Sequence, residues 1–321
     1  WWMAVWGLGP ARARNTSGTI ELMPYGLLQN RVDALVKHDG ILWMSGAVFG
    51  DSRTGITLFN PQANQFSYIE SGLYRDFQAV DINCLTVDDS SLYIGTPFGF
   101  LVMDKRTHQI RHSIARREGL IDDEVICLEV SGNVVYVGTA GGLSAISAAD
   151  TIVYIRPELF ENKVVYDLEQ VDSALWIASS AGAYRLKLTS GRLQRFQDPD
   201  QVLFGDVYNI ERYGDDLWFL SDDGVVRLDL QSGASEPFWH GPARYRPRAL
   251  AVNQTIMAVG TDKGLLMTYY RHPKRIKREF TVSDGLASNN VLSLVADGDY
   301  LWVGSDHGLT RFLWNNPERV D

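Results

Sequence analysis

One short string recurs along this chain at nearly even spacing, and a repeat limits the possible folds more than any other sequence feature. "LWVGSDHGLTRF" (301–312) returns, with changes, as "LYIGTPFGFLVM" (92–103), "VYVGTAGGLSAI" (135–146) and "LWIASSAGAYRL" (175–186). Aligned on the aromatic position, the units are 50, 43, 40, 42, 40 and 44 residues apart. Seven units therefore occupy the chain. The aligned positions are Trp43, Tyr93, Tyr136, Trp176, Trp218, Ala258 and Trp302.

Each unit consists of short β-rich runs separated by turn residues. In the last unit, "VLSLVA", "LWVGS" and "LTRF" are separated by "DGD" and "DHG", which is typical of β-hairpins. A period in the low forties with such runs indicates propeller blades rather than helical pairs. We therefore predict an all-β fold, a seven-bladed β-propeller of four-stranded antiparallel blades. The expected innermost strands are 32–36, 82–87, 125–130, 165–171, 207–213, 247–252 and 291–296.

A glycine recurs in the second turn of every unit. Glycine at a fixed turn position indicates a backbone with positive φ, which a Cβ would disfavour. The aligned glycines are Gly55, Gly99, Gly142, Gly182, Gly224, Gly264 and Gly308.

Six units add a fourth run, but the seventh does not. The segment 19–32 parallels 278–291, so we expect an N-terminal strand to complete the last blade and close the ring. The predicted organisation is an arm or a remnant of a signal or anchor segment at 1–18, the propeller at 19–316 and a tail at 317–321. The apolar start "WWMAVWGLGPARA" fits the end of a signal peptide or membrane anchor, although an arm without such a role is an open alternative.

Composition excludes some function classes. The chain has 321 residues, of which 45% are apolar and 21% charged, as in ordinary globular proteins. A net charge of −9 argues against nucleic acid as a partner, because binding phosphates needs a basic face. The sequence has no run of eighteen apolar residues that would span a bilayer.

The pattern "GL…NNV…L…LWVGSDHGL…F" (285–312) resembles the repeat of the two-component-regulator propellers, and 119–146 matches it well. Units four to six match less well, and "LWIAS" and "LWFLS" lose the glycine after the aromatic strand. The resemblance implies a periplasmic, sensor-like domain of the kind found in bacterial hybrid histidine kinases. The sequence contains no kinase or helix-turn-helix segment, so a scaffold subunit of an envelope complex is equally open.

Signals for catalysis are weak. The six histidines have no metal-ligand spacing within a Cys or carboxylate cluster, so we expect no metal and no cofactor. His307, beside Asp306, is either a general base or a solvated turn residue. Cys84 and Cys127 occupy equivalent positions on neighbouring inner strands, too far apart for a disulfide, so we expect free thiols. We predict a non-catalytic recognition propeller; the alternative is a hydrolase or lyase with its site at the channel mouth.

Ligands of propellers bind to loops, because the strands pack against neighbouring blades. The residues that precede the inner strands are expected to form a ring around the channel mouth. Their polar character is explained equally well if these positions are simply solvated. The connection 239–248 brings together residue types that dominate interfaces, and the turn at 47–55 is lengthened. The predicted binding residues are Arg31, Asp81, Glu124, Asp206, Arg246, Asn290, Trp239, Tyr245, Arg248 and His307, with Val164 as the apolar member of the ring.

A basic segment reverses the acidic character of the chain locally. "RHPKRIKR" (271–278) lies in an outer hairpin, where anionic lipid head groups or an acidic partner would be attracted, although an idle solvated hairpin is equally open. The expected partners are therefore another protein or a small polar ligand, with a membrane surface as a further option. The basic residues are Arg271, Lys274, Arg275, Lys277 and Arg278.

Overall fold

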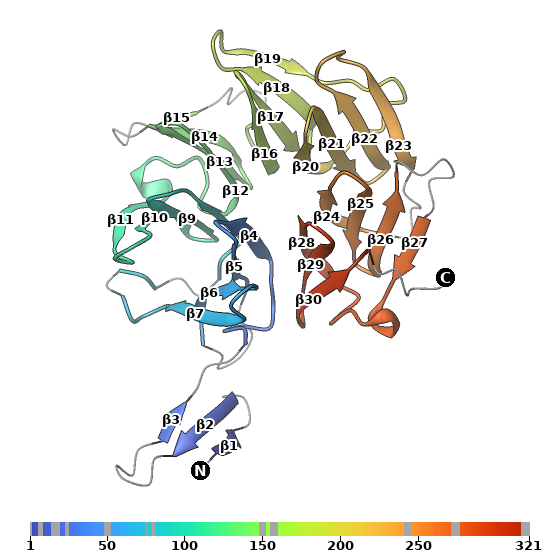
Figure 1. Ribbon diagram of the computed structural model, residues 1–321. Coiled ribbons are helices and arrows are strands. Elements are labelled where there is room, and N and C mark those ends of the chain that lie inside the picture. The colour runs from blue at the N-terminus through green and yellow to red at the C-terminus, as the bar shows by residue number, and fades with distance from the viewer. Residues whose placement is uncertain are drawn as a thin grey trace.

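The computed structural model describes residues 26–47, 53–74, 76–78, 81–147, 160–240, 245–270 and 277–315, together with the backbone of strands at 2–5, 9–13, 20–22 and 152–154. Within this part, seven antiparallel sheets stand around a central axis (Figure 1). The chain enters each sheet at its innermost strand and leaves at its outermost strand. The predicted seven-bladed propeller is confirmed, and the innermost strands lie where the sequence placed them.

The blades follow one another in chain order, each from its innermost to its outermost strand. Their strands are β4 (Ala34–His38), β5 (Ile41–Ser45), β6 (Gly55–Asn60) and β7 (Gln65–Glu70) in blade 1; β8 (Cys84–Val87), β9 (Ser91–Thr96), β10 (Gly99–Asp104) and β11 (Ile110–Ile114) in blade 2; β12 (Val125–Ser131), β13 (Val134–Thr139), β14 (Gly142–Ser147) and β15 (Ile152–Tyr154) in blade 3; β16 (Val165–Val171), β17 (Ala174–Ser179), β18 (Gly182–Lys187) and β19 (Arg192–Arg195) in blade 4; β20 (Val207–Tyr213), β21 (Asp216–Ser221), β22 (Gly224–Asp229) and β23 (Ser235–His240) in blade 5; β24 (Pro247–Val252), β25 (Ile256–Thr261), β26 (Gly264–Tyr269) and β27 (Lys277–Phe280) in blade 6; and β28 (Val291–Asp297), β29 (Tyr300–Ser305) and β30 (Gly308–Leu313) in blade 7.

Two 3₁₀ helices, η1 (Arg116–Glu118) and η2 (Val282–Asp284), lie in connections between blades. We call the end of the ring that carries these connections and the turns between second and third strands the upper face. The opposite end, which carries the β4–β5, β8–β9 and equivalent turns, is the lower face. In the part of the chain that is described, no helix is long and apolar enough to cross a membrane.

The repeated motif is explained by packing between blades. Trp43 packs among side chains of blade 2, Trp176 among those of blade 5, and Trp302 among those of blade 1. Each of these tryptophans is at most 4% exposed. The aromatic of the second strand therefore fills the space between its own blade and a neighbour, which is why the string recurs once per blade.

The turn glycines are confirmed, since all seven have positive φ, reaching 147° at Gly142 and Gly224. The Ser or Thr at the end of the second strand is also explained, because its hydroxyl bonds to the carbonyl oxygen of the turn glycine. Thr139 Oγ1 donates to the Gly142 carbonyl oxygen at 2.8 Å, and Ser305 Oγ makes the same bond to Gly308. Ser45 Oγ reaches the Gly55 carbonyl oxygen at 2.6 Å, so the lengthened first turn keeps this bond.

The predicted closure by an N-terminal strand is not what the structure shows. β3 (Ile20–Leu22) pairs with β2 (Gly9–Ala13), which pairs with β1 (Trp2–Val5), and this three-stranded sheet lies outside the ring in Figure 1. An antiparallel neighbour close in sequence already satisfies the polar groups along one edge of β3. Blade 7 accordingly has three strands among the described residues, and the predicted boundary at residue 18 lies outside them.

The ring is instead closed by contacts between the last and first blades. Ser293 Oγ donates to the Val32 carbonyl oxygen at 2.8 Å, and the Val32 amide donates to the Ser305 carbonyl oxygen at 2.9 Å. Lys37 pairs with Asp297 across the same junction.

Candidate functional site: the mouth and wall of the central channel

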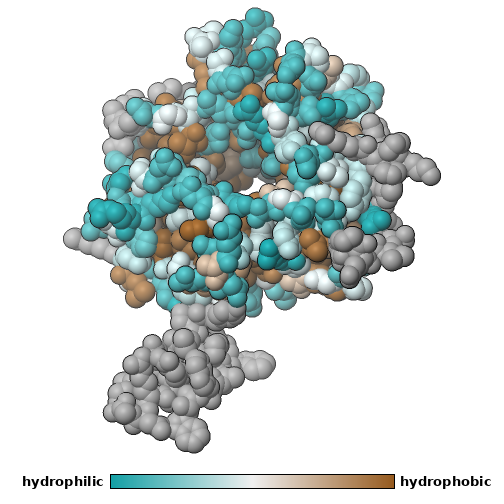
Figure 2. All heavy atoms as spheres, viewed as in Figure 1, coloured by the Kyte–Doolittle hydropathy of each residue, from teal (hydrophilic) through white to brown (hydrophobic). Residues whose placement is uncertain are grey.

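The seven innermost strands surround a channel of about 1330 Å³. Figure 2 shows it as an opening at the centre of a largely hydrophilic surface. Residues from every blade line it, from Asp33 in blade 1 to Asp299 in blade 7. The volume exceeds that of typical small-molecule pockets and would admit a peptide segment or a side chain of a partner.

A β-bulge near the start of five inner strands determines which side chains reach the mouth. The strand register skips one residue in each of blades 3 to 7, and a bulge of this kind redirects the skipped side chain. All five skipped residues line the channel. They are Ile126, Tyr166, Tyr208, Arg248 and Leu292.

Two of these residues form an aromatic pair at the mouth. The rings of Tyr166 and Tyr208 are 5.1 Å apart between centroids and inclined by 57°. Tyr208 donates its hydroxyl to Asp222 Oδ2 at 2.9 Å, and Tyr166 donates to Asp206 Oδ2 at 3.4 Å. Burial and these carboxylates raise the pKa of both hydroxyls. The pair therefore presents neutral hydroxyls and ring faces.

Blade 6, which follows blade 5 around the ring, adds two arginines to the mouth. Arg246 and Arg248 are exposed, and both line the channel. The Arg246 amide is anchored to Asp262 Oδ1 at 2.9 Å, which fixes the backbone that carries the guanidinium. Aromatic rings, hydroxyls, carboxylates and guanidinium groups in one mouth suit a polar peptide or a small zwitterionic ligand.

Along the channel, side chains satisfy the free edges of the inner strands. Asn83 Nδ2 donates to the Val125 carbonyl oxygen at 2.9 Å, from blade 2 to blade 3. Asp167 of blade 4 acts instead as an acceptor, since its Oδ2 accepts a hydrogen bond from the Ile210 amide of blade 5 at 2.8 Å. An inner strand has no strand partner on its channel side, so such side chains replace the missing ladder bonds.

Blades 3, 4 and 5 carry glutamates at one level of these strands. Glu129 Oε1 accepts from the Gln170 amide at 3.0 Å, and Glu211 accepts from the Val252 amide. Burial raises the pKa of Glu129 to about 7. Burial, with Glu129 and Asp167 nearby, raises the pKa of Glu169 to about 8. Burial, then Glu169 and Asp167, raises the pKa of Glu211 to about 8. Glu169 and Glu211 line the channel, so its wall includes carboxyl groups whose pKa values are raised.

The predicted mouth ring is only partly brought together. Arg246 lines the channel, whereas Arg31 is held by Asp33, with Nη2–Oδ1 at 2.7 Å. Asp206 meets Tyr166, and Asn290 Nδ2 donates to Asp306 at 3.0 Å. Asp81 is half-buried, with its charge near Arg31, Glu124 is exposed and Val164 is half-buried. Because of the bulges, most residues that enter the mouth lie two positions after the predicted ring residues in the chain.

The connection 239–248 does not present its aromatics. Trp239 is 9% exposed and packs in the core between blades 5 and 6. Tyr245 is 7% exposed, with its hydroxyl on Glu279 Oε1 at 2.6 Å. The expectation that these two rings offer contact surface conflicts with their burial, whereas Arg248 is exposed.

The remaining predicted residues lie away from the channel lining. His307 is 73% exposed and contacts Asp306, with Nδ1–Oδ1 at 2.9 Å, as a turn residue. Of the basic segment, residues 271–276 lie outside the described residues, as do 48–52 of the lengthened turn. The Arg278 guanidinium lies over the Tyr269 ring, 5.5 Å from its centroid. Both cysteines are free, as predicted.

The tyrosine pair and the polar residues of blades 4 and 5 are not among the residues predicted from the sequence. A signal was present: "VYDLE" and "VYNIE" place a Tyr, a polar residue and a Glu on two inner strands whose units lack the glycine.

No protein-family model matches this sequence, and no curated protein matches it. Several solved structures share the fold. The extracellular domain of BT4673 from B. thetaiotaomicron, described as a one-component or hybrid two-component system, superimposes with a TM-score of 0.72 at 16% identity. That match covers 89% of this chain and 39% of the other, so this chain spans well under half of that domain.

Two further structures are similar. PorZ, a surface component of the type-IX secretion system of Porphyromonas gingivalis, has a TM-score of 0.63 at 16% identity, covering 93% of this chain and 40% of that one. The WD40 propeller domain of Doa1 has a TM-score of 0.67 at 13% identity, covering 92% and 97%. At these identities the likenesses show the fold alone.

Proposed function

We propose that this chain is a non-catalytic recognition propeller that binds a protein partner on its upper face. The observation that carries the proposal is the position of its exposed apolar side chains. Among the described residues, the exposed large hydrophobics are Leu73, Phe98, Phe204 and Val282, at 71, 78, 65 and 50% exposure. All four lie in connections between blades or in turns between second and third strands, which are elements of the upper face.

Exposed apolar side chains gathered on one face are a common mark of an interaction surface. The upper face also contains the mouth with its tyrosine pair and arginines, residue types that dominate binding energy at interfaces. The described turns of the lower face, by contrast, are short and rich in Asp, Gly and Ser. The partner would sit on the rim and insert a polar segment into the mouth.

The setting proposed for this role is outside the cytoplasm, as a sensor-like domain or a scaffold subunit of an envelope complex. The repeat pattern supports this setting, as does the likeness to an extracellular domain and to a surface secretion component. Family membership in the two-component-regulator propellers belongs to the same proposal.

Site-specific photo-cross-linking tests the face directly. A photoreactive phenylalanine analogue replaces Phe98 or Phe204 in the full chain in its native cells. The matched control places the analogue at Arg106, an exposed turn residue of the lower face. We expect one defined adduct from positions 98 and 204 and none from 106. Adducts of equal yield from both faces, or from neither, would remove the upper face from consideration.

A further inference from the structure

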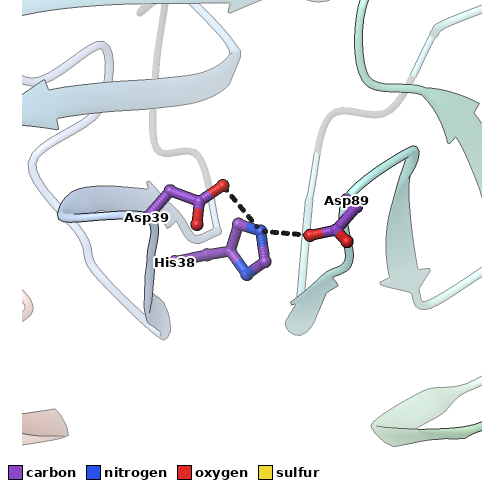
Figure 3. A group of neighbouring side chains, drawn as sticks. All are labelled: His38, Asp39 and Asp89. Carbon is purple, nitrogen blue, oxygen red and sulfur yellow. Dashed lines mark ion pairs between the residues drawn. The ribbon is translucent and has the colours of Figure 1, made fainter.

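Two hairpin turns of the lower face bring a histidine and two aspartates together, far from the channel mouth. His38 and Asp39 lie where β4 turns into β5, and Asp89 lies where β8 turns into β9, in the neighbouring blade (Figure 3). His38 Nε2 is 3.1 Å from Asp39 Oδ2 and 3.9 Å from Asp89 Oδ1. One ligand atom from each of the three residues lies within 4.8 Å of the others.

The local sequences explain why both carboxylates are available. Asp39 and Gly40 have φ of 50° and 74°, as in a two-residue hairpin turn. In the other turn, Asp88 holds the backbone, since its Oδ1 accepts from the Ser90 and Ser91 amides at 2.7 and 2.6 Å. Asp89 is not needed for the turn, and its side chain is fully exposed.

The histidine supplies an observation that the turn geometry does not explain. The His38 side chain is 21% exposed, but its Nε2 is enclosed, and neither carboxylate contact gives it a hydrogen bond of acceptable geometry. Figure 3 shows this nitrogen directed into the space between the two carboxylates. An enclosed ring nitrogen without a hydrogen bond is costly, and a cation coordinated at this point would remove that cost.

We propose that His38, Asp39 and Asp89 bind a divalent transition-metal ion of the Zn²⁺ class. Zinc bonds to nitrogen and oxygen are about 2.0–2.2 Å, which sets ligand atoms roughly 3.4 Å apart in a tetrahedron. The distances of 3.1 and 3.9 Å from His38 Nε2 lie on either side of that value. One imidazole with two carboxylates suits Zn²⁺ or a neighbouring ion and leaves a position for water or a partner's ligand.

Lys105 competes with the ion for one of these ligands. Its Nζ lies 3.4 Å from the same Asp39 Oδ2, donates to the Asp88 carbonyl oxygen at 3.2 Å, and stands 5.9 Å from the Trp43 ring centroid. An ion bound to Asp39 would displace this ammonium group and repel it. Removing the lysine charge should therefore tighten binding of the ion. A cluster with a purely structural role would show no such effect.

Calorimetric titration of Zn²⁺ into tag-free, chelator-treated full chain tests the site. We expect one ion per chain, affinity lowered roughly tenfold or more in both His38→Gln and Asp89→Asn, and affinity raised in Lys105→Met. His307→Ala is the matched control, because that histidine has a single carboxylate neighbour in the described residues. It should titrate like the unchanged chain.

Titration of Co²⁺ followed by visible absorption adds a readout that reports nitrogen and oxygen ligation. Asp89 is fully exposed, so Asp89→Asn leaves the fold intact even if a His38 variant fails to fold. Absence of saturable binding to the unchanged chain would overturn the proposal. So would wild-type affinity in both ligand variants. Because the site lies on the lower face, neither result bears on recognition by the upper face.

Discussion

Blades that keep the repeat and blades that depart from it differ in what stands between neighbouring sheets. In blade 3, Gly138 faces Cys127, and a Cβ on that glycine would lie 2.3 Å from the cysteine Sγ. In blade 4, Ala178 takes the place of the glycine and faces Asp167. The cysteine fills this site and its Sγ donates weakly to the Val165 carbonyl oxygen of the next blade at 3.5 Å, whereas the aspartate accepts from the Ile210 amide of the next blade.

Blade 5 departs in the same way. Leu220 replaces the glycine and faces Asn209, whose Oδ1 accepts from the Leu250 amide at 2.9 Å. Blades 4 and 5 also provide the tyrosine pair and two of the channel glutamates. Ser293 of blade 7, which faces the retained Gly304, also bonds across to the next blade, so what distinguishes blades 4 and 5 is the tyrosines and glutamates that they add to the channel.

Replacement of a regular aromatic should have the largest effect on stability. Trp302→Ala removes a side chain that is 3% exposed, packs in the first blade's core and joins the ring ends. We expect a loss of about 3–5 kcal/mol, measured by chemical denaturation. A change below about 1 kcal/mol would show that the junction between blades 7 and 1 does not depend on this packing.

A matched pair of substitutions compares the two kinds of blade at one structural position. Asp167→Ala leaves the Ile210 and Leu168 amides without their acceptor, so we expect a loss of about 2–3 kcal/mol. Cys127→Ala, at the equivalent place in blade 3, should cost about 1 kcal/mol. Equal losses from both in denaturant titrations would contradict the distinction between a weak thiol donor and a carboxylate that accepts from two amides.

The glutamates predict a pH dependence with a definite sign. Glu211 has a pKa raised to about 8 in the folded chain, against 4.5 as its ordinary value. Between these values the unfolded chain has released a proton that the folded chain keeps, so stability falls as pH rises through this window. Glu211→Gln keeps an acceptor for the Val252 amide and should raise Tm at pH 8.5 by about 3 °C or more.

The control for this prediction is Glu161→Gln, which makes the same change of charge at an exposed position. Its melting temperature should follow that of the unchanged chain from pH 6 to pH 9. If Glu211→Gln and Glu161→Gln give parallel curves, Glu211 ionises like a surface carboxylate.

The smallest effect on stability is expected at the mouth. Arg246 and Arg248 are exposed, so Arg246→Glu with Arg248→Glu should change the free energy of unfolding by less than about 0.5 kcal/mol. The same double change should lower the yield of the position-98 adduct, because it reverses the charge where the partner is proposed to bind. An unchanged yield would exclude the arginines from the interface.

Local rules of the sequence were sufficient for the strands, the turns and the number of blades. Glycines with positive φ and short alternating runs are determined by neighbours within a few residues, as at Gly142 and in 165–171. The mouth depended on more distant contacts. A bulge in the inner strand of blade 5 moved the lining side chain from Asp206 to Tyr208, and burial between blades removed Trp239 from the surface.

Comparison of equivalent bulge positions tests the central claim most directly. Tyr166→Ala with Tyr208→Ala changes two irregular blades, and Ile126→Ala with Leu292→Ala makes the same change at bulges without polar groups. With the photoreactive residue at position 98, we expect the tyrosine pair to lower adduct yield roughly tenfold and the control pair to retain it. Equal yields from the two double variants would contradict the assignment of recognition to the channel mouth of blades 4 and 5.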